Sequence, residues 1–305
     1  MADLLRHRPG GPARLRALLG RPEPLLAPGC YDGLSARLVE LAGFEAAYMT
    51  GFGTAASLLG RPDVGLLGMS EMADNARRIV HATDLPVIAD ADTGYGNAIN
   101  VIRTVQTYEQ AGVAGLHIED QVAPKRCGHM DGTEVVPAGE LVAKVQAAVE
   151  ARTDVDLVII ARTDARASLG LDEAIDRARR SHAAGADLVF VEALRDETEI
   201  ERVATELADV PRLFNWAEGG RTPPLPYDRL AELGFALVIM PLSTLLAATT
   251  AMRAALERIR ADGTPLRALE LMPSFNGFTE LVGLAEVRKL EVRFGSPAGD
   301  GPEPD

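Results

Sequence analysis

The sequence predicts an α/β protein of the (β/α)8, or TIM-barrel, class. Three observations lead to this prediction. Short apolar runs rich in Val, Ile and Leu recur along most of the chain, and a segment with helical spacing of apolar residues follows each of them. Polar residues gather where these runs end, which is where a parallel barrel carries its active site.

The eight apolar runs lack an alternating polar face, as expected of strands that are buried on both sides of a parallel sheet. They are Pro24–Pro28, Ala46–Thr50, Pro86–Ala89, Gly115–Ile118, Leu157–Ala161, Asp187–Val191, Arg212–Asn215 and Ala236–Met240. An open doubly wound sheet is the alternative. It is disfavoured because Gly51-Phe52-Gly53, the nearest candidate for its glycine-rich fingerprint, lacks the third glycine.

The helical segments follow the strands in order, and several end at a glycine that can adopt a left-handed C-cap. They are Gly33–Ala42, Ser70–Thr83, Ala98–Ala111, Ala138–Ala151, Leu171–Ala184, Glu197–Leu207, Tyr227–Leu233 and Leu245–Asp262. With a first helix over Pro12–Leu19, they complete one predicted domain over residues 1–295.

Two further segments follow the predicted barrel. Apolar residues at helical spacing predict a helix over Phe278–Phe294, which needs its own barrel or a neighbouring subunit to cover it. The last residues, 296–305, are rich in Pro, Gly and Asp and are predicted to be disordered.

Composition excludes several classes of partner. The 305 residues are 47% hydrophobic and 25% charged, which is ordinary for a globular protein with a sizeable core. The net charge of −13 argues against nucleic acid and against an anionic membrane surface. No apolar run is long enough to span a membrane. The two cysteines, Cys30 and Cys127, form no disulfide framework, so we expect a cytoplasmic protein.

Carboxylates at two strand ends predict a metal site. Asp90 and Asp92 are two residues apart, so their side chains point the same way along an extended strand. Together with Glu119 they form a set of hard oxygen ligands, which suits Mg²⁺ with water and substrate oxygens completing its shell. Mn²⁺ is the alternative metal. The structural alternative is a polar strand end that binds nothing.

Other strand ends carry candidate substrate-binding residues. Arg162 suits bidentate binding of a carboxylate or phosphonate. Glu192 ends the sixth strand, and Asn215, Trp216 and Glu218 end the seventh. We expect Trp216 to form a wall of the pocket, with packing in the core as the alternative.

The loop Lys125-Arg126-Cys127-Gly128-His129 predicts a reactive thiol. Lys125, Arg126 and His129 flank Cys127, and positive neighbours lower the pKa of a thiol because they favour the thiolate. Such a sulfur could give or take a proton near neutral pH. The structural alternative is a small apolar residue that happens to lie in a loop.

Several motifs together carry a family resemblance: Thr50-Gly51, Gly60-Arg61-Pro62-Asp63, Asp90-Ala91-Asp92-Thr93-Gly94-Tyr95-Gly96, His117-Ile118-Glu119-Asp120-Gln121, the Lys125–His129 loop, Ala161-Arg162-Thr163-Asp164 and Glu218-Gly219-Gly220-Arg221-Thr222-Pro223. On these residues the chain resembles the isocitrate lyase/phosphoenolpyruvate mutase superfamily. Within it, the chain looks most like carboxyvinyl-carboxyphosphonate phosphonomutases, 2,3-dimethylmalate lyases and oxaloacetate hydrolase/2-alkylmalate lyases. It is also similar to methylisocitrate lyases.

The resemblance implies how the site residues are used. Asp92 would hold Mg²⁺ directly, and Asp90 and Glu119 would do so directly or through water. Thr50, Gly51 and the backbone amide of Phe52 would hold a substrate carboxylate beside Arg162. The substrate site would also include Asp63, Glu192 and Gly128, and the Cys127 loop would close over it. The resemblance further implies a homotetramer that exchanges its final helix between subunits.

Departures from the family pattern narrow the range of expected substrates. Leu246 stands where methylisocitrate lyases carry an arginine, and a second arginine is missing from residues 272–279. A tricarboxylate would leave one buried carboxylate unpaired, so smaller dicarboxylates are favoured. Phe52 and Trp216 replace residues that are usually smaller or aliphatic, which suggests an altered pocket.

The resulting hypothesis is a Mg²⁺-dependent lyase. It would cleave a carbon–carbon bond of a 2-hydroxy dicarboxylate of the 2-alkylmalate type, or act on an oxaloacetate-like acid, and release a 2-oxoacid such as pyruvate through an enolate. Tyr48 is the candidate base, and Cys127 is the candidate acid, aided by Lys125 and His129. A carboxyvinyl-carboxyphosphonate phosphonomutase is the alternative. A methylisocitrate lyase ranks lower, and a barrel that has lost catalysis ranks last.

Overall fold

The computed structural model describes residues 4–5, 10–130 and 132–295. The chain divides into two compact units, residues 7–246 and a second unit made of residues 1–6 and 247–305. The tail over residues 296–305, for which disorder was predicted, lies outside the described residues.

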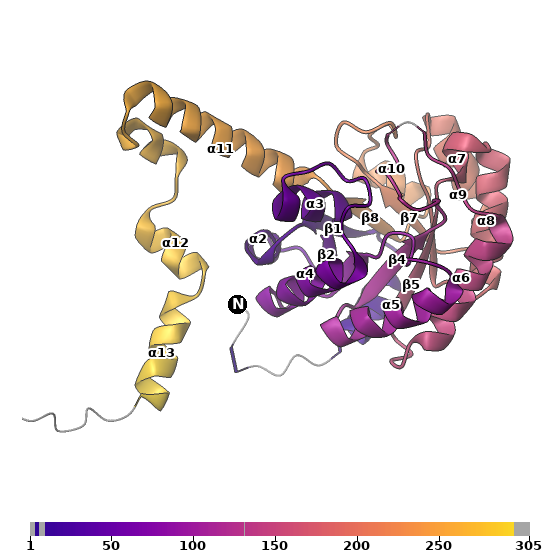
Figure 1. Cartoon of the computed structure of the whole chain (residues 1–305), viewed down its shortest axis with the longest axis horizontal. Helices are drawn as coiled ribbons and strands as arrows, with labels where there is room; N and C mark the ends of the chain where they lie inside the picture. Colours follow the sequence, from indigo (N-terminus) through magenta and orange to yellow (C-terminus); the bar gives the residue numbers. More distant parts are fainter. Residues whose placement is uncertain (1–3, 6–9, 131, 296–305) are drawn as a thin grey trace, which may run out of the picture. The chain divides into compact units, whose positions relative to one another are not determined.

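Between Leu25 and Met240, eight parallel strands form a closed barrel, in which each strand pairs with the next and β8 pairs with β1 (Figure 1). The strands are β1 (Leu25–Cys30), β2 (Ala47–Met49), β3 (Val87–Asp90), β4 (Gly115–Glu119), β5 (Val158–Thr163), β6 (Leu188–Val191), β7 (Arg212–Asn215) and β8 (Leu237–Met240). All eight predicted strands and the predicted fold class are confirmed.

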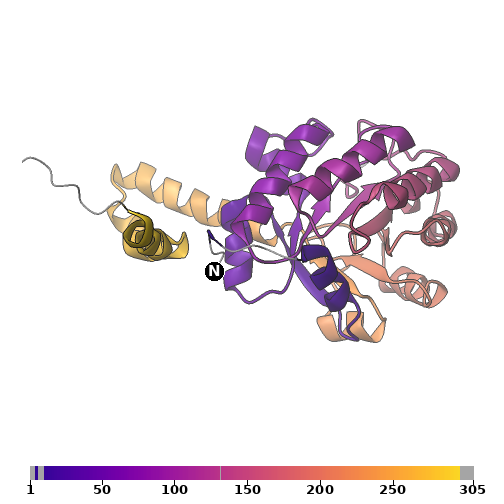
Figure 2. The ribbon, with the colours of Figure 1, turned by 90° about the horizontal axis from the view of Figure 1, so that it is seen from below.

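Helices cover the outside of the barrel, as two perpendicular views show (Figure 1, Figure 2). They are α1 (Gly11–Leu19), α2 (Gly33–Leu41), α3 (Gly51–Leu59), α4 (Met69–Ala82), α5 (Ala98–Ala111), α6 (Ala138–Ala151), α7 (Ala165–Ser168), α8 (Leu171–Ala183), α9 (Glu197–Glu206) and α10 (Tyr227–Glu232). The short helices α3 and α7 were not predicted. Helix α3 begins after the N-cap Thr50, but its sequence contains two glycines and several small residues. It therefore lacks the spacing of large apolar residues that predicts a helix.

The interior of the barrel is filled by side chains from most of its strands. Ile88, Ile160 and Phe190 belong to one buried cluster, and Leu15 and Leu18 of α1 pack into the same cluster. The barrel is therefore closed by apolar contacts where α1 packs against it. The polar residues lie at the carboxyl ends of the strands.

The second unit consists of helices. α11 (Ser243–Asp262) follows β8 in sequence and carries the chain into this unit, which continues with the 3-10 helix η1 (Leu266–Leu271), α12 (Phe275–Leu281) and α13 (Leu284–Phe294). The prediction of one helix over Phe278–Phe294 was wrong: Gly283, with φ of 89°, separates α12 from α13. No helix within the described ranges is both long and apolar enough to cross a membrane.

Candidate active site

One cavity at the carboxyl ends of the strands brings together most of the residues singled out from the sequence. Its lining includes side chains from β2, β3, β5, β6 and β7 and from the loop after β4. The predicted site residues among them are Tyr48, Thr50, Phe52, Asp63, Asp90, Lys125, Cys127, Gly128, His129, Arg162, Glu192 and Asn215. Segments far apart in sequence thus share one polar cavity.

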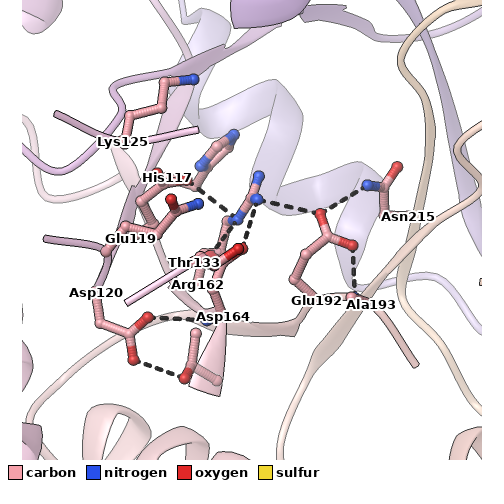
Figure 3. Close-up of polar contacts among 12 residues, drawn as sticks. His117, Glu119, Asp120, Lys125, Thr133, Arg162, Asp164, Glu192, Ala193 and Asn215 are labelled. Carbon is pink, nitrogen blue, oxygen red and sulfur yellow. Dashed lines mark hydrogen bonds and ion pairs between the residues drawn. The ribbon is translucent and has the colours of Figure 1, made fainter. Parts of the chain in front are cut away.

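Arg162 lies at the centre of this cluster, surrounded by three carboxylates (Figure 3). Its Nε and Nη2 atoms donate to the two oxygens of Asp164, each at 2.9 Å. Nε also lies 3.2 Å from Glu119 Oε2, and Nη2 lies 3.3 Å from Glu192 Oε2. The guanidinium is held in one orientation, because the bidentate bond to Asp164 leaves little freedom.

Asp164 and Asp120 form a buried layer behind Arg162 that the sequence analysis placed in motifs without assigning a role. Asp120 Oδ1 accepts from the Asp164 backbone N–H at 2.8 Å. Its Oδ2 accepts from the Thr163 hydroxyl at 2.7 Å and from Arg177 Nη1, on α8, at 3.0 Å. The orientation of Arg162 is therefore connected to a helix of the outer layer.

Lys125 is buried and paired with two carboxylates. Its Nζ donates to Asp63 Oδ2 at 2.7 Å and lies 2.8 Å from Asp92 Oδ1. The charge of Lys125 is therefore paired with Asp63 and Asp92. The sequence had instead predicted that this charge acts on Cys127.

Buried carboxyl groups outnumber buried cations in this region. The cations are Lys125, Arg162 and Lys144, whereas the buried carboxyl groups are Asp63, Asp90, Asp92, Glu119, Asp164 and Glu192. Burial raises the pKa of Asp92 to about 6, although Lys125 opposes the shift. Burial likewise raises the pKa of Glu119 well above its ordinary value, against the effect of Arg162. The raised pKa values mean that the charged forms of Asp92 and Glu119 are unfavourable here, and a bound cation would stabilise them.

The predicted metal ligands do not form a preorganised site. Within residues 4–5, 10–130 and 132–295, no three His, Cys, Asp or Glu side chains converge as a ready metal site. Asp90 lines the cavity, whereas Asp92 and Glu119 are absent from its lining and are buried against Lys125 and Arg162, which do line it. Glu119 Oε1 has no hydrogen-bond partner among the described residues. The residues fit a cation that is bound by few carboxylates and several waters.

The prediction of a lowered thiol pKa was wrong. Cys127 is half-buried, and burial raises the pKa of its thiol to about 11, with Asp63 and Glu192 adding to the shift. The lowering contributions, a hydrogen bond from the His129 backbone and the charge of Arg162, are smaller. Cys127 therefore carries its proton at neutral pH, which suits a proton donor.

The pH dependence of alkylation tests this protonation state. Between pH 8 and 10, the rate at which iodoacetamide modifies Cys127 is expected to rise about tenfold per pH unit, because only the thiolate reacts. Mass spectrometry can follow the modified peptide. Cys30 serves as the internal control, because it is fully buried. A rate that levels off near pH 7 would mean that the thiol pKa is low.

His129 joins the Cys127 loop to the loop after β7. Its Nδ1 accepts from the backbone N–H of Arg221 at 3.1 Å, and its Nε2 lies 3.5 Å from Glu192 Oε1. Gly128 precedes it and lies against the cluster: a Cβ there would come 2.5 Å from Arg162 Nη2 and 2.6 Å from Asp164 Oδ1. Only glycine lets the loop approach this closely.

Gly128→Ala is therefore expected to keep the loop away from the cavity. We expect kcat/KM to fall by about a hundredfold, because a displacement of about 1 Å at an active site has an effect of this size. Steady-state kinetics measures the change. Gly139→Ala, where a Cβ would meet nothing within 4 Å, is the matched control. Equal activity of the two variants would contradict the close approach.

Tyr48, the candidate base, is paired with a histidine that the sequence analysis did not assign. Its hydroxyl oxygen lies 2.7 Å from His117 Nε2, and both side chains are buried. Burial raises the pKa of Tyr48 well above its ordinary value and lowers the pKa of His117 to about 4. Both groups are therefore neutral near pH 7, and Tyr48 needs an acceptor such as His117 if it is to take up another proton.

Two predictions at the end of β7 need correction. Trp216 does not line the cavity: its Nε1 donates to the carbonyl of Leu225 at 3.0 Å, and its ring packs against an apolar cluster. Glu218 accepts from the backbone N–H of Leu242 at 2.9 Å and also bonds Ser243, so it caps the start of α11. Neither side chain is part of the cavity lining.

Comparison with known proteins identifies the family. A family model described as phosphoenolpyruvate phosphomutase matches residues 15–260. The chain belongs to the phosphoenolpyruvate phosphomutase family. One relative of the chain is the 2,3-dimethylmalate lyase of Eubacterium barkeri. It is 45% identical to the chain, over 92% of the chain and 97% of the relative. The chloroplastic carboxyvinyl-carboxyphosphonate phosphorylmutase of Arabidopsis thaliana is 44% identical over 92% and 84%.

Solved structures agree with this placement in the phosphomutase family. Oxaloacetate acetylhydrolase in complex with 3,3-difluorooxalacetate is similar with a TM-score of 0.89 at 39% identity, covering 94% of this chain and 98% of the other. Phosphonopyruvate hydrolase in complex with oxalate and Mg²⁺ has a TM-score of 0.85 at 33% identity, covering 93% and 99%. The resemblance inferred from the motifs is confirmed, and the chain is an enzyme of the lyase and phosphonomutase superfamily.

Proposed function

We propose that this enzyme is a Mg²⁺-dependent lyase that cleaves a carbon–carbon bond of a 2-hydroxy dicarboxylate of the 2-alkylmalate type and releases a 2-oxoacid such as pyruvate. The observation that carries the proposal is that the Cys127 thiol, whose pKa is raised by burial, lines the same cavity as Arg162, Asp90 and Glu192. The 45% identity to a 2,3-dimethylmalate lyase supports this substrate class.

The start of α3 and Arg162 would bind the substrate carboxylates. Thr50 caps α3 and lines the cavity together with Phe52, and the first N–H groups of a helix have no partner within the helix. Gly51 lies against Asp90: a Cβ there would come 2.4 Å from Asp90 Oδ2. A carboxylate can therefore approach the helix start beside the acidic cluster.

Asp90, Asp92 and Glu119 would hold the magnesium ion. The excess of buried carboxyl groups over cations and the unpartnered Glu119 Oε1 favour a divalent cation at this place. A family relative was solved with oxalate and Mg²⁺. When bound, Mg²⁺ polarises substrate oxygens as a Lewis acid.

The side chains of this chain would move two protons. Tyr48 would take the proton of the substrate hydroxyl as the carbon–carbon bond breaks, and the neutral His117 at 2.7 Å would accept the phenol proton. The departing fragment carries the electron pair of the broken bond at carbon. Cys127 would give that carbon its proton, and Arg162 would keep the fragment's carboxylate oriented.

A phosphonomutase is the second candidate. The 44% identity to a carboxyvinyl-carboxyphosphonate phosphorylmutase favours it, and Arg162 suits a phosphonate as well as a carboxylate. The Cys127 thiol distinguishes the two candidates in chemical terms, because protonation of a carbanion is required only when a carbon–carbon bond is cleaved.

An assay of the purified enzyme with and without Mg²⁺ tests the proposal. The substrates are 2-alkylmalates, oxaloacetate and 2-methylisocitrate, with ³¹P NMR for phosphonates. We expect a 2-oxoacid from a 2-alkylmalate, detected with lactate dehydrogenase and NADH, and loss of activity with EDTA. A new carbon–phosphorus signal without lyase activity would replace the proposal by the second candidate.

We further propose a cytoplasmic homotetramer in which helices α12 and α13 cover another copy of the chain. Several large apolar residues of these helices are exposed, among them Phe275 at 81% and Val292 at 88%. On the barrel unit, Leu34, Leu38 and Leu41 form an exposed stripe along α2. Light scattering of the purified chain should give a tetramer, and a chain truncated after α11 should not.

A further inference from the structure

We propose that Lys144, on α6, is a positioning residue that fixes the turn carrying Asp92 and thereby the direction of the Asp92 carboxylate. The inference rests on the proposed function, in which Asp92 binds the metal. Lys144 Nζ donates to the backbone carbonyl of Thr93 at 3.1 Å, and the lysine side chain is 3% exposed. It reaches the residue next to Asp92 from a helix outside the barrel.

The turn after β3 has a conformation that needs external support. Asp92 has φ of 46° and Tyr95 has φ of 58°, both in the left-handed region that residues with a Cβ rarely adopt. This conformation brings Asp92 Oδ1 to 2.8 Å from Lys125 Nζ. Such backbone strain persists only where surrounding contacts hold it.

The carbonyl groups of this turn are held from several directions. Those of residues 90, 92, 93 and 94 each accept a hydrogen bond from outside the turn. The donors are, in the same order, Tyr108 Oη at 3.1 Å, Glu119 N at 2.9 Å, Lys144 Nζ at 3.1 Å and Thr104 Oγ1 at 3.0 Å. Lys144 thus holds the peptide between Thr93 and Gly94, one peptide beyond the one that follows Asp92.

Lys144 differs from the other three donors because it is charged. A buried ammonium is costly, and its ion-pair partner Glu140, at 3.7 Å, is itself 42% exposed. A neutral side chain could donate the same hydrogen bond at lower cost. The charge is explained if it also acts on the acidic cluster, since Asp120 and Glu119 both attract the ammonium.

The variant Lys144→Met tests the proposal, because it keeps the side-chain length and removes the donor and the charge. Mn²⁺ is the probe, and free Mn²⁺ is measured by electron paramagnetic resonance with the full chain. We expect the Kd for Mn²⁺ to rise at least about tenfold, as for other residues that orient metal ligands. The Mg²⁺ concentration for half-maximal activity should rise by the same factor, with activity recovered at saturating Mg²⁺.

Two control variants separate positioning from a general effect. Gln146→Met introduces the same residue at an exposed position of α6 and should bind Mn²⁺ like the wild type. Lys144→Arg keeps a charged donor and should lose less affinity than Lys144→Met. If circular dichroism shows that Lys144→Met does not fold, Lys144→Gln replaces it. The Kd for Mn²⁺ of Lys144→Gln is then compared with that of Lys144→Arg, and a higher Kd for Lys144→Gln supports the proposal.

The outcomes also separate this inference from the proposed function. If the wild type binds Mn²⁺ and a folded Lys144→Met variant binds it with equal affinity, the positioning role is wrong. This holds even if the melting temperature of the variant is lower than that of the wild type. Wild type that binds no Mn²⁺ overturns the metal-dependent function and, with it, the role of Lys144.

Discussion

Arg162→Gln is expected to lower kcat/KM by about a thousandfold, because removing one partner of a buried, hydrogen-bonded charge cluster costs about 3–5 kcal/mol. The variant leaves Glu119, Asp164 and Glu192 without their shared cation, so an anionic substrate would meet uncompensated negative charge. Steady-state kinetics with the preferred substrate measures the change.

Arg166→Gln is the matched control for this prediction. Arg166 is also a buried arginine paired with a carboxylate, Glu199, but it lies on α7 and does not line the cavity. We expect it to lower the stability of the protein with little effect on kcat/KM. Equal losses of kcat/KM in both variants would show that Arg162 acts through the fold alone.

Cys127→Ser is expected to lower kcat by at least about a hundredfold, which is the usual contribution of a general acid. Serine has nearly the same shape as cysteine, but its hydroxyl is a much weaker acid than the thiol. The fold should stay intact, because Cys127 is only half-buried and lies in a loop. Thermal unfolding and kcat are measured on the same preparation.

Cys30→Ala controls for the loss of a cysteine. Cys30 is buried in β1, and burial raises its pKa, so it takes no part in chemistry near neutral pH. We expect a lower melting temperature with kcat unchanged. A Cys127→Ser enzyme that keeps normal turnover would remove the proposed acid and leave the thiol as a packing residue.

The barrel could be predicted because its signals are local. A strand buried on both faces reads as a continuous apolar run, and a glycine after a helix marks the helix end, as at Gly112. The division between α12 and α13 could not be predicted with the same certainty. Gly283 lies inside a run of helical spacing, and only the structure shows its left-handed conformation.

The location of the site could also be predicted, because parallel strands bring their carboxyl ends to one rim. The state of Cys127 could not, because its thiol pKa depends on burial and on Asp63 and Glu192, which are distant in sequence. Trp216 shows the same limit: its position after β7 placed it near the rim, but its side-chain direction is set by the bond to Leu225.

The connection from Arg162 through Asp164 and Asp120 to Arg177 has a practical consequence for protein engineering. Arg177 Nε also binds Glu173 Oε1 at 2.8 Å, and the Glu173 carboxylate reaches solvent on α8. Random libraries confined to this outer helix should thus yield variants with altered substrate preference, although no residue of α8 lines the cavity.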